Sequence, residues 1–281
     1  MNILVIHSHN ANRGDEAAVK AMVDELLIKY PGATITISNN GFTPYPGMPE
    51  NVIQIDRFPK LESRMAQLEF FIVLLFKGKF AFTKEARKFI RALKEADVVL
   101  HAPGGPSIGD TYFKAEKLYL WRLNLIRRMG IPYIFYAPSM GPFNCASRNK
   151  LRKEVISGAE RIVLRDPISV KYVKDFLPGV EVEQALDSAL QHDIDIDKNE
   201  TKYNNYPELK NFIENHEKCI GITITDLKWH PVHKNEKIIE QIPTAFKVFI
   251  TQKVKEGYGV IFIPQLYGNL NDTKVMNDYM L

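Results

Sequence analysis

Cysteine is scarce in this sequence: only Cys145 and Cys219 occur among 281 residues, and they form no CxxC pair. Two isolated cysteines exclude a disulfide framework and a zinc cluster built on thiolates. Such sparse use of cysteine is typical of proteins in a reducing compartment. The cysteine pattern therefore favours a cytoplasmic protein.

An excess of charge of either sign is also missing, as is an export signal. The net charge is only +4, so binding to a polyanion would need a local basic patch, and no nucleic-acid partner is predicted. The N-terminus, MNILVIHSHN, has no basic region and no apolar run of the length that a signal peptide requires. Hydrophobic residues make up 45% and charged residues 25% of the chain, which is ordinary for a globular protein.

Short apolar, β-branched runs alternate along the chain with longer amphipathic segments. This alternation predicts an α/β fold with a doubly wound parallel sheet. The runs predict strands over residues 2–7, 33–38, 52–55, 98–101, 131–137, 162–164, 180–184, 219–225 and 260–264. Helices are expected over residues 16–30, 111–129, 146–158, 168–176 and 235–256, from 272 onward, and within a helical pattern over 61–96.

The composition changes near residue 191 and indicates two domains. Residues 1–190 form the first α/β domain, 191–217 are polar and read as a linker or surface helix, and 218–281 begin a second α/β unit. The DIDID run in the polar segment is no calcium loop, because Lys198 stands at its glycine position and Asn204 at its glutamate position.

The stretch VVLHAPGGPSIGD, Val98–Asp110, carries the clearest ligand-binding signal. A buried strand runs into a glycine-proline turn and then a helix, and ligands of open α/β sheets bind at the carboxyl ends of strands. The stretch fails as a nucleoside-triphosphate loop, because Asp110 and Thr111 replace the lysine and Ser/Thr of that motif. Asp110 is expected to contact ligand, to N-cap the helix that follows, or to do both.

Several histidines stand at predicted strand ends. His7, His9 and His101 could titrate near a ligand site, or could serve only in packing and hydrogen bonding. His230 and His233 have an i, i+3 spacing but no accompanying cysteine or carboxylate motif, so no metal site is predicted.

The segment Leu68–Phe82, LEFFIVLLFKGKFAF, is rich in aromatic and aliphatic residues around two lysines. It is too short and too interrupted to span a bilayer. One interpretation is packing into the core. The other is peripheral contact with an anionic membrane, since aromatic residues beside lysines suit that interface.

Six short motifs occur in order and cover nearly the whole chain. They are NRGDEA (Asn12–Ala17), PGGPSIGD (Pro103–Asp110), MGP (Met140–Pro142), RDPISVKYVKD (Arg165–Asp175), LDSAL (Leu186–Leu190) and FIPQLYG (Phe262–Gly268). Together they resemble the motifs of the polysaccharide pyruvyl transferase family. Pro106 departs from the family pattern, which usually has a third glycine at this position.

The resemblance implies a two-domain, GT-B-like architecture and transfer of pyruvate from phosphoenolpyruvate to a cell-surface or capsular glycan as a ketal. Phosphoenolpyruvate is then the donor substrate, no cofactor is needed, and the acceptor is a glycan or a lipid-linked oligosaccharide. The enzyme would work in the cytoplasm or peripherally at the inner face of the membrane. Two other hypotheses stay open: a glycosyltransferase that uses a sugar nucleotide, and a non-catalytic glycan- or anion-binding remnant.

Arg165 is the candidate for gripping the donor's phosphate or carboxylate, because it follows a strand and precedes a helix N-terminus. The alternative is an ion pair with Asp166 or Asp187. Asp15 and Glu16 are candidates for binding the acceptor hydroxyl or for proton transfer, and helix capping is the alternative for Asp15. The remaining candidate substrate-binding residues are Asn12, Gly14, Gly104, Gly105, Ser107, Asp110, Gly141 and Ser169.

The resemblance also implies further strands and an arginine-x-histidine segment that helps to hold the donor, and no such segment follows Gly268. The expectation is therefore a C-terminally truncated chain with an incomplete second domain, which does not catalyse pyruvyl transfer by itself.

Overall fold

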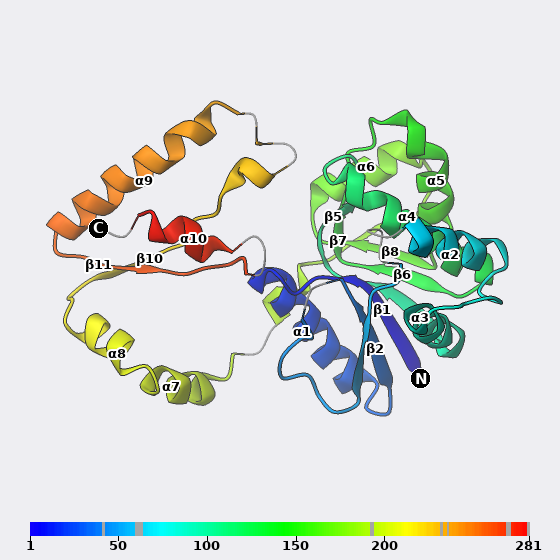
Figure 1. The fold of residues 1–281 in the computed structure, drawn as a ribbon, viewed down its shortest axis with the longest axis horizontal. Helices are drawn as coiled ribbons and strands as arrows, with labels where there is room; N and C mark the ends of the chain where they lie inside the picture. The colour runs from blue at the N-terminus through cyan, green and yellow to red at the C-terminus, as the bar shows by residue number, and fades with distance from the viewer. Residues whose placement is uncertain are drawn as a thin grey trace. The chain divides into compact units, whose positions relative to one another are not determined.

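The computed structural model describes residues 1–40, 43–59, 64–191, 194–230, 233–234, 236–267 and 271–279. These residues form two compact units, the N-terminal unit Met1–His192 and the C-terminal unit Asp193–Leu281 (Figure 1). Within the polar segment predicted as a linker or surface helix lie two helices, α7 (Ile196–Asn204) and α8 (Pro207–Glu214). Both helices belong to the C-terminal unit.

A seven-stranded sheet forms the centre of the N-terminal unit, and every pair of neighbouring strands is parallel. This confirms the predicted α/β fold with a doubly wound parallel sheet. In spatial order the strands are β3 (Val52–Asp56), β2 (Thr34–Asn39), β1 (Asn2–Ser8), β4 (Val98–His101), β6 (Tyr133–Tyr136), β8 (Arg161–Leu164) and β9 (Glu183–Gln184). The chain reverses its direction of travel across the sheet between β1 and β4, where open α/β sheets bind ligands.

Helices bury both faces of this sheet, which explains why its strands read as continuous apolar runs. Leu4 and Ile6 of β1 pack into a core formed with the helices on one face, whereas Ile3 and Val5 pack beneath α1 (Arg13–Lys29) on the other. The first core contains side chains of α2 (Arg64–Leu75), α3 (Lys84–Glu95), α4 (Phe113–Met129), α5 (Asn149–Ser157) and α6 (Pro167–Phe176).

Two segments that lie outside the predicted strands are strands. β5 (Gly104–Ile108) pairs in parallel with β7 (Pro138–Met140), and together they form a separate two-stranded sheet. Glycine and proline disfavour strands locally, so this pairing depends on the tertiary contact between the two segments. The glycine pair therefore forms the start of β5 and is not followed directly by a helix.

The C-terminal unit contains a smaller parallel pair, β10 (Cys219–Ile222) and β11 (Gly259–Phe262). α9 (Ile238–Lys255) supplies Ile250 and Phe246 to its core, and α10 (Asp272–Asn277) ends its described part. Short 3-10 turns complete the chain: η1 (Ala146–Arg148), η2 (Ser188–Gln191) and η3 (Leu227–Trp229). Among the described helices, none has the length and apolar character needed to cross a membrane.

Candidate functional site at the β1–β4 edge

Asp15 lies in the first turn of α1, just after β1. The N-cap of α1 is Asn12, whose Oδ1 accepts a hydrogen bond from the Gly14 N–H at 2.7 Å, so the capping role considered for Asp15 is wrong. The carboxylate of Asp15 instead lies against the backbone of Gly104. A β-carbon built on Gly104 would stand 3.1 Å from Asp15 Oδ1.

The environment of Asp15 raises the pKa of its carboxyl to about 6. Burial is the main cause, because it disfavours the charged form, and the negative charge of Asp187 adds to it. The guanidinium of Arg165 acts in the opposite direction. A carboxyl with this pKa exchanges its proton close to neutral pH, as general acid–base catalysis requires.

Arg165 follows β8 and makes two side-chain contacts. Its Nε donates a hydrogen bond to Ser139 Oγ at 2.9 Å, and its Nη1 forms an ion pair with Asp187. The ion pair considered as an alternative for Arg165 is thus present. Both partners are about one quarter exposed, at 26% and 28%, so the pair stays within reach of a ligand.

A chain of hydrogen bonds holds Arg165 from behind. Ser139 Oγ donates to Asp166 Oδ2 at 2.8 Å, and Ser169 Oγ donates to the same oxygen at 2.8 Å. Ser169 is buried and also accepts the Met140 N–H at 2.9 Å. Ser169 therefore orients the Arg165 network within the protein, whereas ligand contact by Ser169 stays a prediction.

His101, at the end of β4, forms a pair with Ser107 of β5. Ser107 Oγ and His101 Nε2 are 2.8 Å apart, and His101 Nδ1 lies 2.9 Å from the Ala102 carbonyl oxygen. The carbonyl can only accept, so Nδ1 carries the proton and Nε2 accepts from the serine hydroxyl. Burial lowers the pKa of His101 to about 4, which keeps the ring neutral at pH 7.

Glu16 and Asp110 are both engaged in contacts within the protein. Glu16 is buried on α1 and pairs with Arg13 at 2.9 Å and Lys20 at 3.0 Å. Asp110 accepts the Asn144 N–H at 2.6 Å and pairs with Arg152 at 2.7 Å. The N-cap of α4 is Tyr112, without a side-chain hydrogen bond, so the predicted capping of this helix by Asp110 is wrong.

The predicted glycines differ in what surrounds them. Gly104 has a φ of +142°, which side chains rarely adopt, whereas a β-carbon on Gly105 would meet nothing within 4 Å. Gly105 therefore leaves open space beside the Asp15–Gly104 contact. Gly141 has a φ of +89° and a β-carbon there would lie 2.6 Å from the ring of Tyr172, so this glycine is required for packing.

The sequence model of the polysaccharide pyruvyl transferase family matches residues 12–278, almost the whole chain. The chain belongs to the polysaccharide pyruvyl transferase family. This match confirms the resemblance found in the motifs. The comparison with curated proteins found no match.

Solved structures show that this pyruvyl transferase family member has a GT-B-like fold. It is similar to a UDP-GlcNAc 2-epimerase from Neisseria meningitidis bound to UDP-GlcNAc, with a TM-score of 0.56 and 13% identity over 99% of this chain and 69% of that one. A putative UDP-N-acetylglucosamine 2-epimerase from Listeria monocytogenes gives a TM-score of 0.52 and 12% identity, covering 99% and 65% of the two chains. The chain thus spans about two thirds of the length of these structures.

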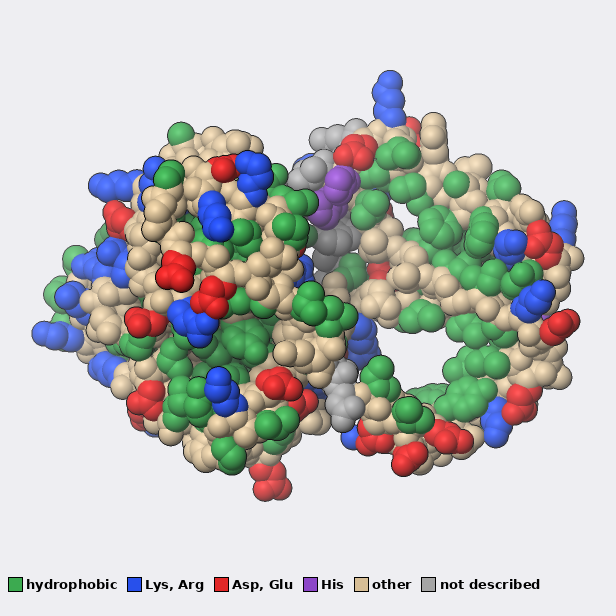
Figure 2. Space-filling model, turned by 180° about the vertical axis from the view of Figure 1, so that it is seen from behind, with side chains coloured by type: hydrophobic (Ala, Val, Ile, Leu, Met, Phe, Trp, Pro, Cys, Tyr) green, Lys and Arg blue, Asp and Glu red, His purple; other side chains and the backbone are tan. Residues whose placement is uncertain are grey.

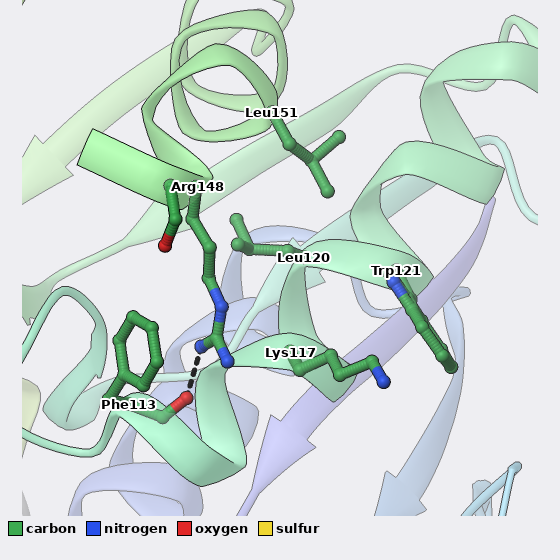
Figure 3. Close-up of a pocket in the computed structure, with 7 residues that line it drawn as sticks. Phe113, Lys117, Leu120, Trp121, Arg148 and Leu151 are labelled. Atoms are coloured by element: carbon green, nitrogen blue, oxygen red, sulfur yellow. Dashed lines mark hydrogen bonds between the residues drawn. The ribbon is translucent and has the colours of Figure 1, made fainter. Parts of the chain in front are cut away.

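A separate pocket of about 400 Å³ in this family member lies between α4, η1 and α5 (Figure 3). Its two cations are already engaged: Lys117 lies 4.4 Å from the centre of the Trp121 ring, and Arg148 stacks on Phe113 and pairs with Glu116 at 2.9 Å. Figure 3 also shows the hydrogen bond from Arg148 to the Phe113 carbonyl. None of the predicted site residues lines this pocket.

Reasoning from the sequence of this pyruvyl transferase family member missed Ser139 as a partner of Arg165. Ser139 lies outside the predicted strands and helices, and a serine in such a segment gives no signal of its own. Asp166 was recoverable, since Asp-Pro before an apolar helix is an N-cap signal, and its Oδ1 does accept the Ser169 N–H at 2.7 Å.

Proposed function

We propose that this protein transfers pyruvate from phosphoenolpyruvate to two hydroxyl groups of a glycan, forming a ketal. The observation that carries the proposal is the Asp15 carboxyl, which lies against the Gly104 backbone and is influenced by the charge of Arg165, in a member of the pyruvyl transferase family. The Asp15 carboxyl can exchange a proton near neutral pH, and the Arg165 guanidinium can bind an anion.

Arg165 binds the phosphate or carboxylate of the donor. A guanidinium suits this task because its planar set of N–H groups matches two oxygens of an anion at once. The ion pair with Asp187 and the hydrogen bond to Ser139 hold the guanidinium in place before the donor binds. The open space beside Gly105 admits the donor close to the backbone.

Asp15 transfers the proton. Protonated Asp15 gives its proton to the methylene carbon of the donor, which becomes a methyl group. C2 then forms a bond to the oxygen of the first acceptor hydroxyl, whose proton returns to Asp15. The second hydroxyl then forms its own bond to C2 as the bond from C2 to the phosphate oxygen breaks. Its proton leaves with inorganic phosphate, so atoms and charge balance.

The test is acceptor-dependent release of phosphate from phosphoenolpyruvate, measured with β-galactosides and with N-acetylmannosamine-containing acceptors. Release by this chain would overturn the expectation that it is inactive by itself. Asp15→Asn should then abolish release, while Asp24→Asn, on the same helix, retains it. The Neisseria meningitidis epimerase that this chain resembles in fold was solved with UDP-GlcNAc bound, so a UDP-sugar is the second substrate tested. Turnover of the UDP-sugar with indifference to phosphoenolpyruvate would overturn the proposal in favour of a glycosyltransferase, and binding without turnover would favour a non-catalytic remnant.

A lipid-linked acceptor requires access to a membrane, and the surface of α2 is suited to it. Phe70 and Val73 enter the core, so core packing explains only part of the Leu68–Phe82 segment. We call the exposed apolar side chains of this segment, together with Met65 on the same helix, the α2 patch. Its members, all between 44% and 74% exposed, are Met65, Leu68, Phe71, Leu75, Phe76, Phe80 and Phe82.

The charges around the α2 patch are positive. Arg64, Lys77, Lys79 and Lys84 are exposed, whereas the acidic Glu69 is buried, where it accepts the N–H groups of Phe82 and Thr83 at 2.7 Å. Figure 2 shows Lys and Arg side chains along the outer edge of the N-terminal unit, where Figure 1 places α2 and α3. Aromatic and aliphatic residues among cations match an anionic bilayer surface.

Co-sedimentation with vesicles tests this contact. We expect binding to phosphatidylglycerol-containing vesicles, little binding to pure phosphatidylcholine, and loss of binding in Phe71→Gln/Leu75→Gln. Ile28→Gln is the matched control, because Ile28 is 73% exposed on α1. Equal binding by the patch variant and the control would contradict the proposed membrane contact and leave pyruvyl transfer untouched.

A further inference from the structure

Arg122, on α4, is a fully buried arginine without a carboxylate partner among the residues that the structure describes. Its side chain is 0% exposed. Nε donates to the Phe58 carbonyl at 2.6 Å and Nη1 donates to Asn40 Oδ1 at 2.7 Å, while Nη2 is buried without any hydrogen-bond partner. A buried cation needs a counter-charge, since its desolvation is otherwise uncompensated.

Arg152, also a buried arginine of this unit, has carboxylate partners that compensate its positive charge. Arg152 is also 0% exposed, and it pairs with Glu116 at 2.7 Å and with Asp110 at 2.7 Å. All three of its guanidinium nitrogens have hydrogen-bond partners. For Arg122, the titratable groups that influence the guanidinium are Tyr119 and Arg57, and burial lowers the pKa of Arg122 to about 9.

Further unpaired donors lie around Arg122. Asn40 is 7% exposed, and because its Oδ1 accepts from Arg122, its Nδ2 must be the buried donor that has no partner. His7 is 3% exposed, has no hydrogen-bond partner on either ring nitrogen, and feels the charge of Arg122. Its ring lies 4.4 Å from that of Tyr119, one helical turn from Arg122.

We infer that Arg122, Asn40 and His7 form a binding site for a compact oxyanion, a phosphate or a carboxylate. The anion supplies the negative charge that Arg122 lacks and accepts from Arg122 Nη2, Asn40 Nδ2 and the N–H of His7. His7 has a φ of +63° at the irregular end of β1, a strained backbone of the kind found at ligand sites. The site is distinct from Arg165 and holds whether or not the protein transfers pyruvate.

Asn40→Asp is the decisive variant, because it places a carboxylate where Asn40 Oδ1 already meets Arg122 and removes only an unpaired N–H group. The thermal unfolding midpoint of the full chain is measured in phosphate, in acetate and in chloride at equal ionic strength. We expect phosphate or acetate to raise the midpoint of the wild type above that in chloride. In chloride, Asn40→Asp should exceed the wild type by about 2–4 °C and should no longer respond to either anion.

Asn39→Asp is the matched control, since it adds the same charge one residue away, at a side chain that already donates to the Thr43 carbonyl at 2.6 Å. It should keep the anion response. Arg122→Met, which removes the buried charge, should lose the response. An unresponsive wild type, or a response that survives in Asn40→Asp, would overturn the inference. A response that is lost only in Arg165→Lys would also overturn it, because the anion would then bind at the proposed donor site.

Discussion

Asp15 differs from an ordinary surface carboxylate in being half-buried, in lying against a glycine backbone and in facing both a cation and another acid. Its pKa of about 6 has a consequence for stability. Between the pKa of an exposed carboxyl and pH 6 the folded state binds more protons than the unfolded state, so stability falls as pH rises through this window.

The first prediction is that Asp15→Asn removes this pH dependence. Because the ionised carboxylate is the destabilising form, the variant should be more stable than the wild type at pH 7, by on the order of 1 kcal/mol. Urea unfolding at pH 4.5 and pH 7 measures both effects. An unchanged pH dependence in the variant would show that the carboxyl titrates normally.

Arg165 carries the second prediction. Arg165→Lys keeps the charge but loses the paired N–H groups, so it should weaken phosphoenolpyruvate binding by about 1.5–3 kcal/mol. Arg161→Lys is the control, because Arg161 is 58% exposed in a surface pair with Glu183 and should leave binding unchanged. Isothermal calorimetry compares the two variants. Equal affinities would exclude Arg165 from the donor site.

Glu116 carries a prediction about stability. Its carboxylate is 0% exposed, pairs with Arg148 and Arg152, and accepts the Gly109 N–H at 2.8 Å. Glu116→Gln leaves Arg152 short of a counter-charge and should cost about 3–5 kcal/mol of unfolding free energy. Glu154→Gln breaks an ion pair whose side chains are 34% and 39% exposed and should cost at most about 1 kcal/mol. Similar losses would contradict this assignment.

At the scale of elements, β5 is a strand that the sequence alone could not predict. The helices and the seven sheet strands follow from apolar periodicity and from N-cap and C-cap signals, and they lie within a few residues of their predicted positions. β5 and β7 consist of glycine, proline and serine among a few apolar residues, so only their mutual pairing makes them strands. The position of β5 also determines that Gly104, and not Gly105, lies against Asp15.

The fourth prediction separates the two glycines of β5. Gly104→Ala should lower stability, because its φ of +142° is strained for alanine and the new methyl would approach Asp15 Oδ1 to 3.1 Å. Gly105→Ala enters open space and should fold normally, yet it should weaken donor binding if the donor lies there. Thermal unfolding and calorimetry together test both. Wild-type donor affinity in Gly105→Ala would remove Gly105 from the site.

At the scale of the whole molecule, the ordered motifs were sufficient to predict the family. They could not predict which side chains meet. Asp15 and Asp187 are separated by most of the N-terminal unit in sequence, and Asn40 and Arg122 lie 82 residues apart. Periodicity reports the face of a helix or strand, whereas these contacts depend on how the elements are ordered in the sheet.

The two units also differ in how much core they contain, and this leads to the last prediction. The sheet of the N-terminal unit is covered on both faces by helices, and its central strands β1 and β4 are almost entirely buried. The sheet of the C-terminal unit has two described strands, and its core contains Ile222, Ile224, Ile250 and Tyr279.

Few buried apolar contacts mean a small free energy of local opening. Hydrogen exchange should therefore be faster at the amides of Cys219–Ile222 and Gly259–Phe262 than at those of Asn2–Ser8 and Val98–His101. Mass spectrometry of the exchanged, intact chain after pepsin digestion measures all four segments at once, and equal protection in the two units would contradict the prediction.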